Sequence, residues 1–248
     1  MDRLLGITPS TTSGGTSETD TTDDTDENET VTPTTTASAV SYIYTGGDSV
    51  IEDYESGEKI ALGTYPTSGS FVDGDFVLNS GSGSLIVEDA TDKVVEFVDG
   101  AGNAFIKAYE ATNAGVIDGR GIAGFELITG SEGNDWIYAG DGGSQLWGGS
   151  GTASDLLTGG NGTDIFIAGK NQGADVIENA ETKDEVHLND ATLSDIVATA
   201  ENNGLIAITF NNGNSIAIRS TEALGAAVIL SDNSKYRYNH ATKAWQSA

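Results

Sequence analysis

A regular alternation of apolar and polar residues runs through the middle of the chain. Between residues 130 and 178 a large apolar residue recurs every nine or eleven residues, at Ile137, Leu146, Leu157, Phe166 and Ile177. Each stands in a short run of alternating character, which is typical of a β-strand with one buried face. We therefore predict five short strands, joined by Gly-rich turns, whose apolar side chains form a thin core.

The turns follow the pattern G-G-x-G-x-D-x-U-x, where U is the large apolar residue. The five repeats begin at Gly130, Ala139, Gly148, Gly159 and Ala168, and the fourth matches at every position. Glycines allow the backbone conformations that direct carbonyl groups inward at a cation. Because Ca²⁺ takes about 6–8 oxygen ligands, more than one short loop supplies, we predict Ca²⁺ as the cofactor, bound between stacked loops. A flexible, solvated loop would share this composition, but the matched phase of the five apolar residues favours the ordered form.

With these repeats, the segment resembles the hemolysin-type (RTX) calcium-binding repeat family. The resemblance implies a parallel β-roll in which two repeats make one coil. Repeats one, three and five then lie on one edge, the odd edge, and repeats two and four on the other, the even edge. The insertions Ala153-Ser154 and Lys170-Asn171 both fall on the odd edge, as this alternation requires.

The resemblance also identifies candidate metal-binding residues. Asp135, Asp155, Asp164 and Asp175 occupy the acidic position of the pattern, whereas Ser144 replaces it in repeat two. The even edge is therefore expected to be the weaker one, unless Asp141 substitutes as a ligand. The remaining candidates are the turn residues Gly130, Glu132, Gly133, Gly142, Gly149, Gly151, Gly160, Gly162 and Gly173.

The flanking sequence predicts an all-β chain in four parts. Residues 1–38 are rich in Thr, Ser, Asp and Glu and are expected to be a disordered linker, whose acidic run lacks the Gly turn of an EF-hand. An N-terminal β unit is expected at 39–115, the β-roll at 116–180, and a C-terminal β cap, with room for a secretion signal, at 181–248.

An internal repeat relates the two flanking units. Shifted by 126 positions, Val50-Ile51-Glu52 matches Val176-Ile177-Glu178. Each copy is followed by predicted hairpins, and the only helix we expect is a short one at 221–227. The predicted hairpins join 94–98 to 104–109, 205–210 to 215–218, and 236–238 to 244–245.

Charge and composition restrict the function. The formal charge is −27, with 38 acidic and 11 basic residues, which disfavours nucleic acid or an anionic membrane as a partner. There is no cysteine and only two histidines, so thiolate metal sites and a zinc site with three imidazole ligands are excluded. No catalytic motif is recognisable, and we predict that the chain is not an enzyme; an enzyme with an unfamiliar site is the remaining catalytic alternative.

The predicted function is that of an extracellular or cell-surface Ca²⁺-binding structural or adhesive module that folds on export. No membrane span or N-terminal signal is recognisable. The RTX resemblance implies type I secretion from a diderm bacterium. The alternative is the export-and-folding tail of a larger RTX enzyme or toxin.

The outward positions of the roll are unusually apolar. Trp136, Tyr138 and Trp147 are expected to project from its sheets. Either the flanking β units fold over both sheets, or one face is a docking surface for self-association or a cell-surface partner.

Overall fold

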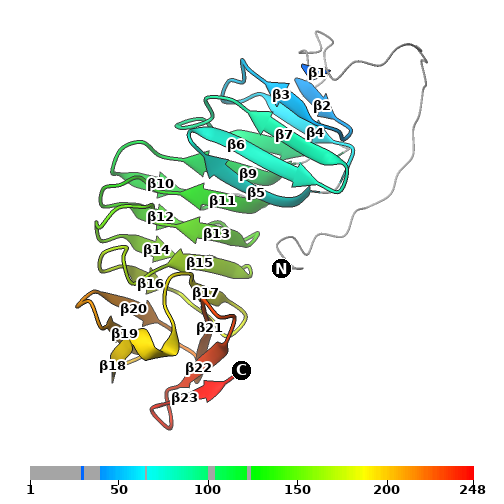
Figure 1. The fold of residues 1–248 in the computed structure, drawn as a ribbon. Coiled ribbons are helices and arrows are strands. Elements are labelled where there is room, and N and C mark those ends of the chain that lie inside the picture. The colour runs from blue at the N-terminus through cyan, green and yellow to red at the C-terminus, as the bar shows by residue number, and fades with distance from the viewer. Residues whose placement is uncertain (1–28, 31–39, 65, 100–103, 122–123) are drawn as a thin grey trace.

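The computed structural model describes residues 29–30, 40–64, 66–99, 104–121 and 124–248. These residues form three β-sheets (Figure 1), and their one helical segment is the short 3₁₀ turn η1 (Leu193–Asp195). The all-β prediction is confirmed. Most of the predicted linker lies outside the described residues, but Glu29–Thr30 form β1, which pairs with a strand of the first unit. No helix in the described part of the chain is long and apolar enough to cross a membrane.

One eleven-stranded sheet, here called the shared sheet, extends along the whole molecule (Figure 1). Its order is β2 (Tyr42–Tyr44), β4 (Lys59–Leu62), β8 (Val95–Val98), β9 (Ala104–Glu110), β11 (Phe125–Thr129), β13 (Ser144–Trp147), β15 (Asp164–Ala168), β17 (Glu185–Leu188), β21 (Leu224–Leu230), β22 (Lys235–Asn239) and β23 (Ala244–Ser247).

Two shorter sheets pack against the shared sheet. The N-terminal sheet has the order β1, β3 (Ser49–Ile51), β7 (Gly83–Val87), β6 (Asp75–Ser80) and β5 (Pro66–Val72). The C-terminal sheet has the order β10 (Val116–Asp118), β12 (Trp136–Tyr138), β14 (Leu156–Thr158), β16 (Val176–Glu178), β20 (Ser215–Arg219), β19 (Leu205–Phe210) and β18 (Ile196–Asn202).

The two shorter sheets cover opposite faces of the shared sheet. On β11, Leu127 belongs to the core beneath the N-terminal sheet, whereas its neighbour Ile128 belongs to the core beneath the C-terminal sheet. Consecutive side chains of a strand point to opposite faces. The two apolar cores therefore lie on opposite faces of the shared sheet, and the change from one face to the other occurs between β9 and β11.

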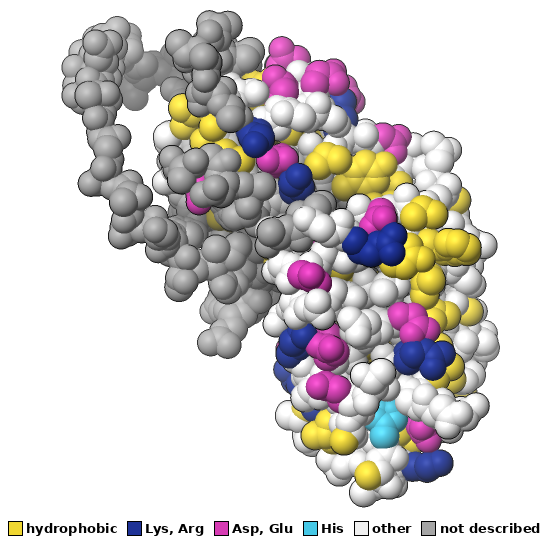
Figure 2. Space-filling model, turned by 180° about the vertical axis from the view of Figure 1, so that it is seen from behind, with side chains coloured by type: hydrophobic (Ala, Val, Ile, Leu, Met, Phe, Trp, Pro, Cys, Tyr) yellow, Lys and Arg dark blue, Asp and Glu magenta, His cyan; other side chains and the backbone are white. Residues whose placement is uncertain are grey.

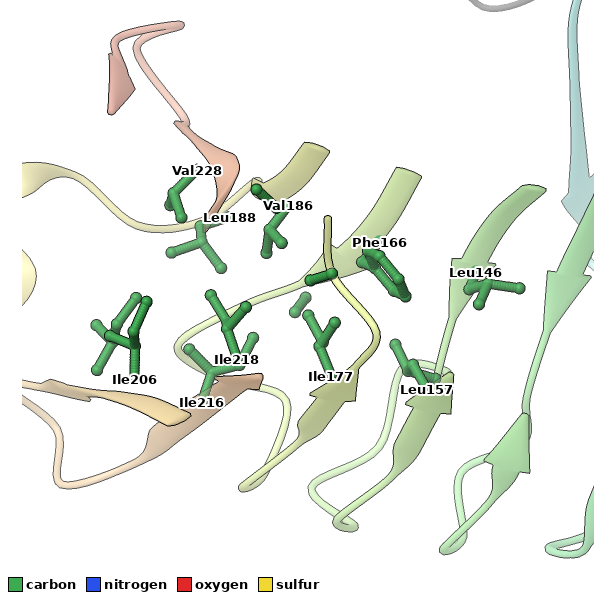
Figure 3. Packing of buried hydrophobic residues seen from close by; sticks show 14 of the residues in the cluster. Leu146, Leu157, Phe166, Ile177, Val186, Leu188, Ile206, Ile216, Ile218 and Val228 are labelled. Carbon is green, nitrogen blue, oxygen red and sulfur yellow. The ribbon is translucent and has the colours of Figure 1, made fainter. Parts of the chain in front are cut away.

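Between β10 and β17 the chain winds as a parallel solenoid. Trp136 pairs with Leu156 and Leu156 with Val176, so one coil takes 20 residues. The five apolar residues that recur in the sequence are all 0% exposed and point between the two sheets (Figure 3). The predicted β-roll is thereby confirmed, and with the flanking units the solenoid has about seven turns.

The flanking units share a topology, as the internal repeat suggests. In the first unit β3 pairs with β7 in parallel and a hairpin then closes the sheet; in the second, β16 pairs with β20 in the same manner. The three predicted hairpins correspond to β8–β9, β19–β20 and β22–β23. The predicted helix at 221–227 is wrong, because β21 occupies most of it and pairs with β17 through buried residues such as Ala227.

Of the two alternatives for the outward apolar residues, complete covering by the flanking units is not observed. These units extend the sheets edge to edge, which satisfies the strand hydrogen bonds of the terminal coils, and β5 of the N-terminal sheet reaches the outer face only at β11. Trp136 is 55% exposed and Val116, its partner in register, is 63% exposed. Figure 2 shows hydrophobic side chains gathered in a band along the solenoid.

Candidate metal centre

The odd edge carries a column of aspartates, each of which lies directly before a strand of the C-terminal sheet. The backbone N–H of Asp135 donates to Asp155 Oδ1 at 2.8 Å, and that of Asp155 donates to Asp175 Oδ1 at 3.1 Å. Asp135 in turn accepts a hydrogen bond from the backbone N–H of Gly115. The predicted alternation is confirmed, since repeats one, three and five are stacked along this edge.

The even edge carries a second column of polar side chains. It has one more residue at each end than the sequence analysis predicts. Ser144 Oγ donates to Asp164 Oδ1 at 2.7 Å, and the backbone N–H of Asp164 donates to Asp184 Oδ1 at 2.9 Å. Glu126 lies in register with Ser144 at the start of the column. The even edge therefore holds three carboxylates.

Asp184 and Glu126 were missed at the sequence level. For Asp184 the available signal is spacing, because it follows Asp164 by 20 residues just as Val186 follows Phe166. For Glu126 the signal is weaker. It precedes Ser144 by 18 residues, but the segment before it lacks the glycines that mark the other turns.

The carboxylates of both columns are buried. Burial raises the pKa of Glu126 and of Asp175 to about 7, and the pKa of Asp155 and of Asp184 to about 6. The pKa of Asp164 is also raised by burial, although the hydrogen bond from Ser144 opposes the shift. A row of desolvated carboxylates is unfavourable when ionised, and a bound cation would offset the cost.

Asp164 gives the most direct indication of a cation. Its Oδ2 atom is buried and receives no hydrogen bond of normal geometry, although the backbone N–H of Gly160 lies close enough to lower the pKa of this carboxyl group. By contrast, Oδ2 of Asp135 accepts from both the backbone N–H and the hydroxyl of Ser131, at 2.7 and 2.8 Å. An unpartnered, buried carboxylate oxygen is costly in a folded protein, so the even edge at Asp164 has a free oxygen ligand where Ca²⁺ would be held.

The glycines of the repeats let backbone carbonyls approach the next loop closely. A Cβ atom at Gly149 would lie 1.9 Å from Ser131 O, and one at Gly173 would lie 1.7 Å from Ala153 O. At Gly160 the corresponding distance is 1.9 Å, to Gly140 O. Side chains at these positions are sterically impossible, and successive loops therefore stack with their carbonyl oxygens adjacent to the carboxylate columns.

The other predicted residues occupy two environments. A Cβ at Gly130, Gly151 or Gly162 would also clash with the backbone of a neighbouring loop, and at Gly133 with Ala114. In contrast, Glu132, Asp141 and Gly142 are exposed at the loop tips. Asp141 accepts hydrogen bonds from the backbone and side chain of Asn161, one coil further on, and is not positioned beside Ser144 as a replacement ligand.

The atoms that are available to bind a cation are mainly oxygens, from single carboxylates and from the backbone. Within the described ranges, no three His, Cys, Asp or Glu side chains converge on one point. A site of this kind requires carbonyl oxygens as additional ligands, which suits a hard cation such as Ca²⁺ and does not suit zinc. The residues present fit Ca²⁺, which Asp155, Asp164, Asp175 and Asp184 would hold through their carboxylate oxygens.

Comparison with known proteins agrees with this geometry. Residues 120–152 and 150–177 match the family model of the RTX calcium-binding nonapeptide repeat (4 copies). The match includes Glu126 and the four aspartates predicted from the sequence, and Asp184 lies just beyond it. The resemblance inferred from the repeats is confirmed for this segment. No curated protein matches the chain significantly.

Proposed function

We propose that this chain, whose residues 120–177 are RTX calcium-binding repeats in a β-solenoid, is a structural or adhesive module that works outside the cell and folds there in Ca²⁺. The observation that carries the proposal is the pair of buried carboxylate columns, and in particular the unpartnered Oδ2 of Asp164. A solenoid with this much buried negative charge is disfavoured where Ca²⁺ is scarce. Extracellular modules bind Ca²⁺ with dissociation constants of roughly 10⁻⁴–10⁻³ M, which matches external Ca²⁺.

A calcium titration followed by circular dichroism tests the proposal. We expect millimolar Ca²⁺ to increase the β signal of the calcium-depleted protein and a chelator to reverse the change. Mg²⁺ at the same concentration should not replace Ca²⁺, because it is smaller and dehydrates reluctantly. An identical β signal in excess chelator and in Ca²⁺ would overturn calcium-dependent folding.

A non-catalytic role is part of the proposal. Asp155, Asp175 and Asp184 accept backbone hydrogen bonds between coils, and His187 pairs with Glu185 on the outer face of the shared sheet, which supports a structural use of these groups. We expect no hydrolysis of peptides, esters or glycans in millimolar Ca²⁺. Turnover that depends on a particular side chain would identify the alternative, an enzyme with an unfamiliar site.

Self-association is a second element of the proposal. Val116 and Trp136 form an exposed apolar column on the C-terminal sheet, and Tyr138 lies beside it beneath the guanidinium of Arg120, 4.6 Å from the ring centre. We expect Trp136→Ser to leave the thermal midpoint unchanged, because the side chain is largely exposed, and to abolish Ca²⁺-dependent oligomers in light scattering. A wild-type protein that stays monomeric at high concentration in Ca²⁺ would contradict self-association.

A further inference from the structure

A groove on the shared sheet has no role in calcium binding. It lies on the face that the N-terminal sheet covers, just beyond the free edge of β5, and encloses about 250 Å³. In Figure 1, β5 and β6 lie in front of this part of the shared sheet. The contact is close, since a Cβ at Gly69 of β5 would lie 3.1 Å from Leu127 of β11.

The groove follows the solenoid axis across several coils. Thr129, Trp147 and Ile167 form its floor, and they are consecutive partners in the register of β11, β13 and β15. Phe71 stands on the β5 side, and Gln172 and Asn189 stand at the loops that end the strands. Because neighbouring strands are about 4.8 Å apart, a ligand along this floor would be long and narrow.

The lining contains no ionisable side chain, although the chain has 38 acidic residues. An uncharged groove gives no counter-charge for phosphate, carboxylate or ammonium groups. Its hydrogen-bonding groups are amides, hydroxyls and the indole N–H, and its apolar surface is an indole, a phenyl ring and aliphatic side chains. This chemistry selects a neutral ligand with both apolar faces and hydroxyl groups.

Two polar atoms of the lining lack partners. Trp147 Nε1, a donor, and Gln172 Oε1, an acceptor, are both buried without a hydrogen bond. Leaving a buried polar atom unpaired is unfavourable, and a ligand that pairs with it removes that cost. A ligand hydroxyl group both accepts and donates, so it can partner either atom when the side chain turns toward the groove.

A peptide strand is the competing ligand, because β5 is an edge strand and edges accept added strands. However, β5 begins with Pro66, has a register shift between Pro66 and Ser68, and contains Gly69. Proline and bulges at a sheet edge are features that prevent strand addition. The edge of β5 is therefore poorly suited to pairing with the main chain of a peptide. The side chains on the floor of the groove are left as the groups that would recognise a ligand.

From these observations we infer that the groove binds a neutral polysaccharide, with sugar rings stacked on Trp147 and hydroxyl groups bonded to Trp147 Nε1 and Gln172 Oε1. Such a site would give the module a glycan surface to attach to, in addition to its calcium-dependent fold.

The test uses the full chain in 5 mM Ca²⁺ and a panel of linear hexasaccharides of glucose, mannose, galactose and N-acetylglucosamine, with a hexauronate as the charged comparison. Binding is measured by calorimetry. We expect at least one neutral hexasaccharide to bind, the hexauronate not to bind, and Trp147→Ala to weaken binding tenfold or more. Trp147→Phe, which removes the indole N–H, and Gln172→Leu, which removes the amide group, should each weaken it several-fold.

Val197→Ala is the control, because it removes an exposed apolar side chain from the C-terminal sheet, and it should bind as the wild type does. Thr129→Trp fills one end of the groove and leaves Trp147 and Gln172 unchanged, so it tests the site even where Trp147→Ala fails to fold. Circular dichroism in Ca²⁺ separates a lost groove from a lost fold. Absence of binding by every neutral sugar, equal losses in the Val197 and Trp147 variants, or Trp147-dependent binding of an extended peptide instead would overturn the inference.

Discussion

Among single residues, Asp164 is distinguished by what surrounds its two oxygens. Oδ1 accepts from Ser144, while Oδ2 is buried without a partner. The sequence favours Asp155 as the more important ligand, since Ser144 leaves Asp164 with no acidic neighbour in the preceding coil. The structure supplies Asp184 in the following coil, and Asp164 therefore has a carboxylate neighbour after all.

We accordingly expect Asp164→Ala to weaken calcium-induced folding at least as much as Asp155→Ala. Loss of a charged ligand should raise the Ca²⁺ midpoint about tenfold, or ~1.4 kcal/mol. Asp141→Ala, at an exposed loop tip, is the control and should leave the midpoint unchanged. The midpoints are read from circular dichroism titrations, and a larger effect of Asp155→Ala would restore the ranking that the sequence favours.

The buried carboxyl groups also predict how pH acts on the calcium-free protein. The pKa of Asp175 rises from 3.8 to about 7 and that of Glu126 from 4.5 to about 7 on folding, so the folded state holds protons more tightly than the unfolded state. This contribution to stability is complete below pH ~4 and is lost as the pH rises towards 7.

The denaturant midpoint of calcium-depleted protein should therefore be higher at pH 5 than at pH 7.5. Asp175→Asn should reduce the difference, whereas Asp141→Asn should not. In saturating Ca²⁺ the difference should shrink or reverse, because Ca²⁺ binds the ionised carboxylates. A calcium-free midpoint that increases with pH would contradict this account.

At the scale of elements, the stacked loops depend on glycine for two separate reasons, conformation and space. Gly173 and Gly213 both have positive φ, +80° and +90°. A Cβ at Gly173 would lie 1.7 Å from Ala153 O of the previous coil, whereas at Gly213 nothing lies within 4 Å. Substitutions at these two glycines therefore distinguish the loss of stability due to backbone strain from the loss due to forcing two loops apart.

Gly213→Ala should destabilise the protein by about 1 kcal/mol, the cost of a left-handed conformation for a residue with a side chain. Gly173→Ala should destabilise it more and should also raise the Ca²⁺ midpoint, because the displaced loop moves carbonyl oxygens away from the odd edge. Thermal unfolding and calcium titration of both variants provide the comparison. Equal effects would mean that the close approach of the loops does not matter for Ca²⁺.

The repeats could be predicted from the sequence because each coil has local features that identify it. These are the Gly-rich turns and the apolar residues that recur at a fixed spacing as far as Ile177. The hairpins after each unit were predictable for the same reason. The pairing of β21 with β17 was not, because these strands are 42 residues apart in register and the run before Leu230 is equally compatible with a short helix. The change of face at β11 was also hidden, since Phe125–Thr129 has large apolar residues on both sides, Leu127 on one and Ile128 on the other.

At the scale of the whole molecule, charge divides the chain into two regions. Every buried acidic residue in the described ranges lies between Glu126 and Asp184. The core beneath the N-terminal sheet contains Tyr42, Tyr44, Tyr54, Phe76 and Phe97 and includes no acidic side chain. The first unit therefore has an apolar core that does not need a cation.

In chelator, we expect the first unit to remain folded while the solenoid opens. Hydrogen exchange followed by mass spectrometry should show slow exchange in residues 42–98 with or without Ca²⁺. Residues 130–188 should be protected only in Ca²⁺. Uniform loss of protection along the chain in chelator would show instead that the two cores unfold as one.

The shared sheet joins these two regions through β9 and β11, which pair in parallel over five residues. A coil of a solenoid contacts only its neighbours, so new coils add most easily to an edge that already exists. With the first unit folded, β9 is that edge before any Ca²⁺ is bound. Ca²⁺ would then bind at the end of a solenoid that has already begun to form, not to an isolated coil. The ions would be bound in order, from Glu126 towards Asp184, as each loop packs on the one before it.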